Sequence, residues 1–225
     1  MTFKELTISE FVRAVAGGAP TPGGGSVSAV VAGLSSALIC MVGSLTAARI
    51  QDKTTHGKSL RNRDTCCENA DPESLMLDAI SKANSLQARF LTLADEDSEA
   101  YNRVIAAYRL PKNTEEEKRA RSASIQDALK EACLVPVEVV KCALQVLDLS
   151  ETMVNHGMKS ALSDAAVACL TAWAGMRGAY FNVRINLSSI KDPAFVEVIE
   201  GDITSCMSSG KAIYERVMAE VEEAL

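Results

Sequence analysis

The strongest candidate for a chemically active side chain is an aspartate that interrupts an apolar helix face. Apolar residues recur at steps of three and four over residues 86–108: Leu86, Phe90, Leu93, Tyr101, Val104 and Tyr108. Asp97 occupies the position that this pattern leaves open, and a carboxylate there costs several kcal/mol unless it is paired or faces a cavity. Two interpretations follow: a salt-bridged or capping aspartate at a kink, or a pocket carboxyl group with a shifted pKa that transfers protons.

Two basic residues flank the proline that ends this helix pattern. Arg109 and Lys112 stand on either side of Leu110-Pro111, where the proline restricts the orientation of the chain. Such a pair could hold an anionic group, although a solvated loop lysine is the more common outcome for a residue like Lys112.

Two further polar clusters lie in the C-terminal half. Ser163 and Asp164 stand at a predicted helix start, where capping alone explains both residues. Asn182 and Asn186 share one face of an apolar helix at i, i+4 spacing. Two buried asparagines need hydrogen-bond partners, which come either from another helix or from a ligand.

A glycine-rich stretch, PTPGGGS over residues 20–26, precedes a long apolar run. Pro22 stiffens the chain, Gly23, Gly24 and Gly25 remove every Cβ, and Ser26 is predicted to cap the following helix. The stretch is no nucleotide-binding loop, because Gly24 stands where that loop needs lysine and no strand precedes it. Two roles remain for the glycines: close approach of a ligand to free backbone N–H groups, or tight helix packing at a dimer interface.

Composition excludes several functional classes. The formal net charge of −6 argues against a nucleic-acid binder, which needs a basic surface. The seven cysteines form no CxxC motif, and with only two histidines neither a metal site nor a disulfide framework is predicted. A reducing cytoplasm suits this cysteine usage.

The apolar run after the glycines is long enough to cross a bilayer, because no charged residue occurs over residues 14–48. Its serines and its small residues Ala29, Gly33 and Ala37, four positions apart, favour instead the buried central helix of a soluble bundle. Acidic residues before the run and the PGGG break disfavour a signal peptide. We therefore expect no membrane segment.

The remaining sequence predicts helices only. Capping boxes at Thr7–Glu10 and Thr114–Glu117 and the pairs Asp71-Pro72 and Asp192-Pro193 predict helix starts. Residues 51–70 are predicted as a loop, and Pro136 as a kink in a helix that ends near residue 149. We expect an all-α fold: residues 1–225 form one domain, a bundle of long, partly kinked helices around a buried small-residue helix.

In this order and spacing the motifs resemble the cyclodeaminase domain of formiminotransferase-cyclodeaminase and its stand-alone relatives, which include methenyltetrahydrofolate cyclohydrolases. The resemblance rests on FVRAVAGGAPTPGGGSVSAVVAGLSSALICMVGSLT, DEDSEAYNRVIAAYRLPKNTEEEKRAR, ALSDAAVA and GAYFNVRINLSSIKD. The family pattern D-x-E-A-[FY] falls on Asp97, Glu99, Ala100 and Tyr101. The stretch LPKNTEEEKRAR looks more like the cyclodeaminase branch.

The resemblance implies a cytoplasmic homodimer whose folate pocket lies at or near the subunit interface. The reaction it implies is ring closure of formiminotetrahydrofolate to 5,10-methenyltetrahydrofolate with loss of ammonia, without metal or redox cofactor. Asp97 is then the first candidate for proton transfer and Asp164 the second, because a desolvated carboxyl group with a raised pKa can give and take a proton.

The other site residues follow from the same resemblance. Lys112 is expected at the glutamate end of the folate with Arg109, or otherwise beside the pterin as a third catalytic candidate. Substrate contacts are expected from Pro22, Gly23, Gly24, Gly25, Ser26, Ser163, Asn182 and Asn186. The alternatives are a cyclohydrolase that uses the same site and a non-catalytic folate-binding helical protein. The partners implied are a folate substrate, which can be polyglutamylated, and, for the cyclodeaminase, a separate formiminotransferase.

The chain departs from the family pattern in two places. Residues 47–72 replace a short basic and aromatic run with a longer segment that lacks an aromatic residue. Met158 follows Gly157 where the family tends to have asparagine. If the basic run and that asparagine contact the folate in the family, these departures are expected to change substrate affinity or activity.

Overall fold

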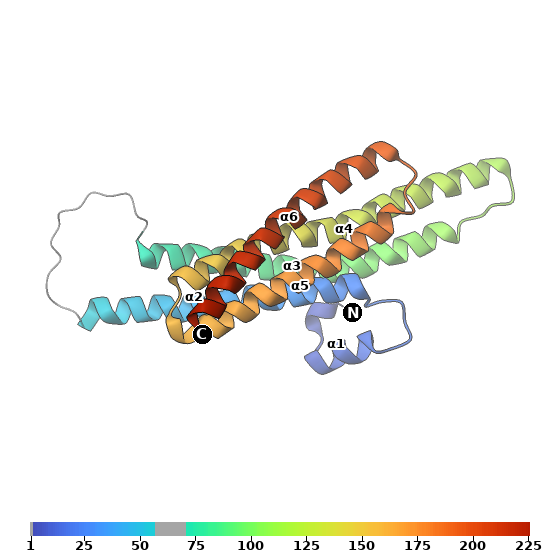
Figure 1. Cartoon of the computed structure of the whole chain (residues 1–225). Helices are drawn as coiled ribbons and strands as arrows, with labels where there is room; N and C mark the ends of the chain where they lie inside the picture. Colours follow the sequence, from blue (N-terminus) through green and yellow to red (C-terminus); the bar gives the residue numbers. More distant parts are fainter. Residues whose placement is uncertain (1, 57–70) are drawn as a thin grey trace.

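The computed structural model describes residues 2–56 and 71–225, except the side chains of residues 53–56. Its long elements are helices, and no strand occurs in these ranges (Figure 1). The helices are α1 (Ile8–Val15), α2 (Gly24–His56), α3 (Pro72–Tyr108), α4 (Glu115–His156), α5 (Leu162–Leu187) and α6 (Pro193–Ala224), with two short 3-10 turns, η1 (Phe3–Glu5) and η2 (Lys159–Ala161). The predicted all-α fold is confirmed.

Local capping sets several helix starts as predicted. Thr7 and Thr114 each form a complete capping box with the glutamate three residues later. The Asp192 carboxylate accepts hydrogen bonds from the first free N–H groups of α6, and Pro193 follows at the first helical position. Asp71 precedes Pro72 in the same way at the start of α3, but its side chain makes no capping bond.

Two helices are longer than predicted. α2 continues to His56, so residues 51–56 are helical rather than part of a loop, while residues 57–70 lie outside the described ranges. α4 passes through Pro136 and ends at His156, beyond the predicted end near residue 149. Pro136 is buried among apolar residues of α4, and this packing offsets the one backbone hydrogen bond that proline removes.

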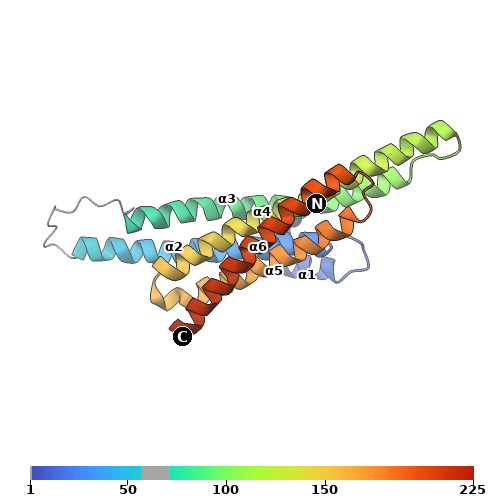
Figure 2. The same cartoon turned by 45° about the horizontal axis from the view of Figure 1, so that its top comes forward.

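Four helices form a ring in which α2 packs on α3, α3 on α4, α4 on α5 and α5 on α2. α6 crosses the outside of α4 and α5 (Figure 2). The α3–α4 hairpin extends beyond the ends of the other helices in both views. The N-terminal segment lies against the bundle through η1, where the Phe3 N–H donates to Asp95 Oδ1 at 2.5 Å. This arrangement brings the glycine-rich start of α2 beside the middle of α3.

The small residues of α2 allow α5 to approach closely. A Cβ on Gly175 would lie 2.8 Å from the Ser28 carbonyl oxygen and 2.9 Å from Ala32 Cβ. Ser35 Oγ donates to the Ala168 carbonyl at 2.8 Å. Although Gly24–Asp52 is long and apolar enough to cross a membrane, the bundle buries 56% of its most apolar window. This side of α2 is the buried small-residue face that the sequence predicts.

The opposite side of α2 is not buried. Leu34 is 56% exposed, and Met41 and Leu45 on the same face are also exposed. The prediction of a largely buried α2 is therefore wrong for this face.

Candidate functional site

Asp97 lies on α3 where that helix passes the first turn of α2. The Ser26 hydroxyl, which is fully buried, donates to Asp97 Oδ2 at 2.9 Å and lies 3.3 Å from Ser98 Oγ. The prediction that Ser26 caps α2 is wrong, because the Gly23 carbonyl already accepts the first helical hydrogen bond from Val27 at 3.0 Å. Ser26 instead holds the carboxyl group against the helix.

Gly25 provides the space that the carboxyl group occupies. A Cβ built on Gly25 would lie 2.2 Å from Asp97 Oδ1 and 2.6 Å from Asp97 Cγ. No side chain larger than hydrogen fits there without displacing the carboxyl group. One of the three glycines is thus explained by close packing of Asp97 on the backbone of α2, a role that the two sequence interpretations did not include.

Burial raises the pKa of the Asp97 carboxyl group, and the hydrogen bonds from Ser26 partly oppose this shift. The carboxyl group therefore holds its proton at higher pH than an exposed aspartate does. It also lies at the N-terminal end of α2, where free N–H groups favour the charged form. A carboxyl group balanced between these influences can both donate and accept a proton.

Asp97 borders a cavity of about 270 Å³ between the start of α2, α3, α4 and the end of α5. Six of its lining residues were predicted from the sequence: Gly23, Gly24, Gly25, Asp97, Asn182 and Asn186. The other six are Pro20, Thr21, Tyr101, Val104, Leu129 and Ala132. The periodicity of α3 pointed to Tyr101 and Val104, whereas no sequence signal marked Leu129 or Ala132.

The two asparagines are held by backbone carbonyls. Asn182 Nδ2 donates to Gly178 at 2.9 Å, and Asn186 Nδ2 donates to Ala132 of α4 at 3.1 Å. The partners that the sequence required thus come from the protein. Both asparagines line the cavity, and an amide oxygen is a hydrogen-bond acceptor.

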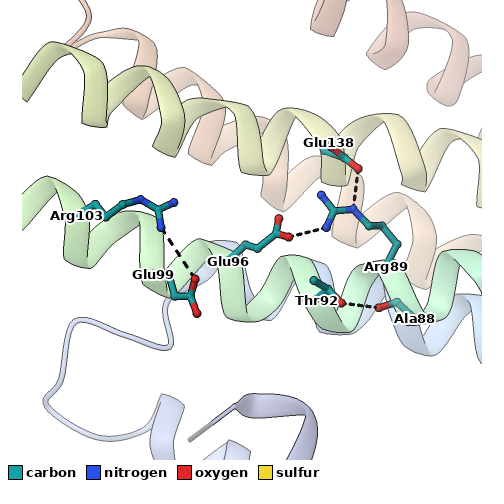
Figure 3. Close-up of polar contacts among 7 residues, drawn as sticks. All are labelled: Ala88, Arg89, Thr92, Glu96, Glu99, Arg103 and Glu138. Carbon is teal, nitrogen blue, oxygen red and sulfur yellow. Dashed lines mark hydrogen bonds and ion pairs between the residues drawn. The ribbon is translucent and has the colours of Figure 1, made fainter.

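Asp95 and Glu96, which precede Asp97 in the sequence, make contacts with other protein groups. Asp95 accepts the Phe3 N–H, and Glu96 pairs with Arg89, which also binds Glu138 of α4 at 2.7 Å (Figure 3). The guanidinium holds the pKa of Glu138 below its usual range. The Arg89–Glu138 pair joins α3 to α4.

Besides Ser26, the predicted residues Pro22, Arg109 and Lys112 are absent from the lining of this cavity. Pro22 follows a cis peptide bond after Thr21 and is buried beside the glycines. Arg109 and Lys112 are exposed at the end of the α3–α4 hairpin. Arg109 is twelve residues beyond Asp97, about 18 Å along the helix axis.

Ser163 and Asp164 lie far from Asp97 within one chain. They stand in the first turn of α5, whereas Asn182 is eighteen residues further on, about 27 Å along the helix. The capping interpretation of both residues is wrong, because α5 starts at Leu162 after Ala161 and no side chain caps it. Asp164 is half-buried and Ser163 is exposed.

The two departures from the family pattern lie at this same far end. The Met158 N–H donates to Thr46 Oγ1 at 3.0 Å, which ties the turn before α5 to α2. Arg49, Met158 and Lys159 border a separate cavity of about 390 Å³ there. Of residues 47–72, those from 57 to 70 lie outside the described ranges.

Removal of the Ser26 hydroxyl tests its influence on Asp97. In Ser26→Ala the carboxyl group loses the hydrogen bond that lowers its pKa, so its pKa rises. We expect the limb of the pH–rate profile that reports Asp97 to move to higher pH. Thr46→Ser, which keeps a buried hydroxyl on the same helix, serves as a control and leaves that limb in place.

The fold and the site together define a helical-bundle protein with a cavity bordered by one partly buried carboxyl group whose pKa is raised. Within the described ranges no group of three or more histidine, cysteine, aspartate or glutamate side chains could hold a metal ion. A model of the formiminotransferase-cyclodeaminase family matches residues 7–205, and the chain belongs to this family.

Individual relatives agree with this assignment. The chain is 36% identical to a methenyltetrahydrofolate cyclohydrolase of Methylorubrum extorquens, over 96% of this chain and 97% of the relative. It is 33% identical to the formimidoyltransferase-cyclodeaminase of Rattus norvegicus over 97% of this chain, but it spans only 37% of that longer protein. The crystal structure of a formiminotetrahydrofolate cyclodeaminase from Thermotoga maritima superposes with a TM-score of 0.79 at 28% identity and covers 98% of both chains.

Proposed function

We propose that this protein is a folate one-carbon enzyme that converts formiminotetrahydrofolate to 5,10-methenyltetrahydrofolate and ammonia. The observation that carries the proposal is the Asp97 carboxyl group, with its raised pKa, packed on the start of α2 at the edge of a cavity. The cyclohydrolase of Methylorubrum extorquens and the cyclodeaminase of Thermotoga maritima both carry a tetrahydrofolate derivative in their names, which supports folate chemistry.

The reaction needs proton transfer at two nitrogen atoms. N10 attacks the carbon of the protonated formimino group, so an N10–C bond forms while the C=N double bond to the amino nitrogen becomes a single bond; that single bond then breaks as ammonia leaves, and the methenyl cation remains. Asp97 accepts the proton released from N10 as a carboxylate and donates a proton to the departing amine as a neutral acid. The amide oxygens of Asn182 and Asn186 are placed to accept hydrogen bonds from the pterin. No step calls for a metal, and we expect dialysis against a chelator to leave activity intact.

A cyclohydrolase is the second candidate, because the Methylorubrum extorquens relative matches the chain over nearly its whole length. Water would then attack the methenyl carbon, and Asp97 would take the proton of that water. One site serves both reactions, since both pass through the same bicyclic carbon.

The methenyl absorbance band separates the possibilities. We expect the band to form when the protein is mixed with formiminotetrahydrofolate. Accelerated loss of the band from added 5,10-methenyltetrahydrofolate would instead identify a cyclohydrolase. No change in either mixture would contradict the proposal and leave a non-catalytic folate binder.

Charge reversal at the end of the hairpin tests where the glutamate tail binds. We propose that Arg109 and Lys112 hold it, since about 18 Å along α3 separates Arg109 from Asp97. In Lys112→Glu we expect KM to rise several-fold, and more for a polyglutamylated folate than for the monoglutamate. Lys118→Glu, at a surface position that pairs with Glu115, is the control. Equal losses for both folates would place Lys112 elsewhere.

We also propose that the protein is a soluble cytoplasmic homodimer and that a separate formiminotransferase supplies its substrate. The exposed apolar face of α2 supports the dimer, because such a face is covered in a stable assembly. Light scattering of the purified chain tests the oligomeric state.

A further inference from the structure

The N-terminal segment forms one wall of the Asp97 cavity. Pro20, Thr21 and Gly23 line the cavity, and all three belong to the stretch that connects α1 to α2. The other lining residues lie on the bundle helices α2, α3, α4 and α5. We call residues 2–23 the strap.

Both ends of the strap are held beside Asp97. At its first end the Phe3 N–H donates to Asp95 Oδ1 at 2.5 Å, and Asp95 stands two residues before Asp97 on α3. At its other end the strap continues into α2, whose Gly25 packs on the Asp97 carboxyl group. Because both ends are held there, any movement of the middle of the strap takes place beside the cavity.

The middle of the strap is α1, which is amphipathic but poorly packed. Its apolar residues stand at positions 8, 11, 12 and 15, the spacing of one helix face. No residue of α1 is buried, and Ile8 is 82% and Val12 59% exposed. Figure 1 shows α1 beside the bundle rather than within it. The apolar face of α1 therefore gains little burial in this conformation.

An apolar groove of about 350 Å³ lies between α1 and the bundle. Ile8, Phe11 and Val12 line it on the side of the strap. Its lining on the side of the bundle consists of apolar residues of α2 and α3: Val30, Leu34, Leu91 and Ala94. Approach of the two walls would remove apolar surface from water, which is favourable. The segment that fits the groove is α1 itself, because α1 already forms one of its walls.

The chain after α1 can accommodate such a movement and transmit it to the cavity. Gly17 and Gly18 follow the end of α1, and glycine adopts a wider range of backbone conformations than other residues. A Cβ on Gly18 would meet no atom within 4 Å, so the chain has open space there. Only Ala19 separates Gly18 from Pro20, so a shift of α1 displaces the cavity wall.

We infer that the strap is a lid: when α1 seats in the apolar groove, Pro20 and Thr21 close over the Asp97 cavity and exclude water from the bound substrate. The inference rests on the proposed function only for the identity of the enclosed molecule, a reduced folate. Exclusion of water matters for this substrate, because water that reaches the methenyl carbon hydrolyses the product of ring closure. A closed strap therefore favours ring closure over hydrolysis.

A disulfide between α1 and α2 tests the closure without any folate. Val12→Cys and Leu34→Cys place thiols on the two walls of the groove, and Val104→Cys places a third thiol in the lining of the Asp97 cavity. We expect oxidation to link positions 12 and 34 within one chain. Alkylation at position 104, followed by mass spectrometry of peptides, should then slow several-fold and recover after reduction.

A second reporter position controls for general effects of oxidation. Leu77→Cys, in place of Val104→Cys, puts the reporter thiol at an exposed site on the same helix and outside the cavity, so its alkylation should not depend on the disulfide. Equal alkylation at position 104 before and after oxidation would overturn the closure. Disulfides that join two chains would show that a second copy fills the groove, and would overturn it as well.

Serine substitutions on α1 test the closure during turnover. Val12→Ser removes an apolar side chain from the groove, whereas Val15→Ser removes one that lies on the same helix outside the groove lining. We expect KM for formiminotetrahydrofolate to rise several-fold in Val12→Ser and to stay unchanged in Val15→Ser. Both side chains are exposed, so Tm should change little in either variant. An unchanged KM in Val12→Ser would contradict the closure.

The alkylation test keeps the inference distinct from the proposed function. An active enzyme whose alkylation at position 104 is unaffected by the disulfide overturns the closure and leaves the enzyme assignment intact. A protein that is inactive in both folate reactions, but whose cavity thiol is protected by the disulfide, overturns the proposed function and supports the closure.

Discussion

Asp97→Asn is expected to lower kcat by about 10²- to 10⁴-fold, the usual contribution of one general acid–base group. The amide is nearly isosteric with the carboxyl group, and its oxygen can still accept the hydrogen bond from the Ser26 hydroxyl at 2.9 Å. The cavity therefore keeps its shape, and KM is expected to change little. Only the proton that the carboxyl group transfers is lost.

The same substitution is expected to stabilise the fold at neutral pH. Because burial raises the pKa of Asp97 in the folded protein, folding favours its neutral form. The stability that this group contributes is fully present below its ordinary pKa of 3.8 and is lost as pH rises through the higher folded value. Asp97→Asn should raise Tm at pH 7 relative to the unsubstituted protein, and the difference should shrink towards pH 3.

A matched control separates these effects from the general loss of an acid. Asp78 lies on the same helix, is exposed and pairs with Lys82, so Asp78→Asn should alter neither kcat nor the pH dependence of Tm beyond a small shift. Near-normal kcat in Asp97→Asn would show that Asp97 is structural and would make Asp164 the leading proton-transfer candidate.

Gly25→Ala is expected to abolish most activity by moving the carboxyl group. The new methyl group would lie 2.2 Å from Asp97 Oδ1, far inside van der Waals contact, and the helix backbone of α2 cannot yield easily. Overpacking of this kind costs about 1–3 kcal/mol of stability. We expect a fall in kcat comparable to that of Asp97→Asn together with a lower Tm, measured by steady-state kinetics and thermal unfolding.

Gly24→Ala provides the comparison at the neighbouring position. A Cβ there would lie 3.6 Å from Asn182 Nδ2, an ordinary contact, so the fold should be unaffected. The added methyl group enters the cavity and should mainly raise KM. If both alanine variants behaved alike, the space beside Asp97 would not be the reason for glycine at position 25.

Local sequence signals determined the helical class and most helix starts. Helix-start signals act within one turn, so they can be recognised in the sequence without any tertiary contact. The examples are the capping boxes at Thr7 and Thr114 and the Asp192-Pro193 pair. Asp97 was also found from the sequence, because a carboxylate at a helical step of an apolar stripe is a local anomaly. The periodicity of apolar residues does not predict where a helix ends when tertiary packing stabilises it. For example, α4 continues past Pro136 to His156.

Only the tertiary structure decided which candidates share a site. Asn182 and Gly24 are 158 positions apart in sequence, and the antiparallel packing of α5 on α2 brings them to one cavity. The same packing separates Asp164 from Asp97, which were the second and the first candidate for proton transfer in the sequence analysis. The space beside Gly25 depends on α2 and α3 meeting at one height, which the packing of these two helices sets. Residue types and spacing identify which side chains could react, but distances between helices depend on packing, and packing is a property of the whole fold.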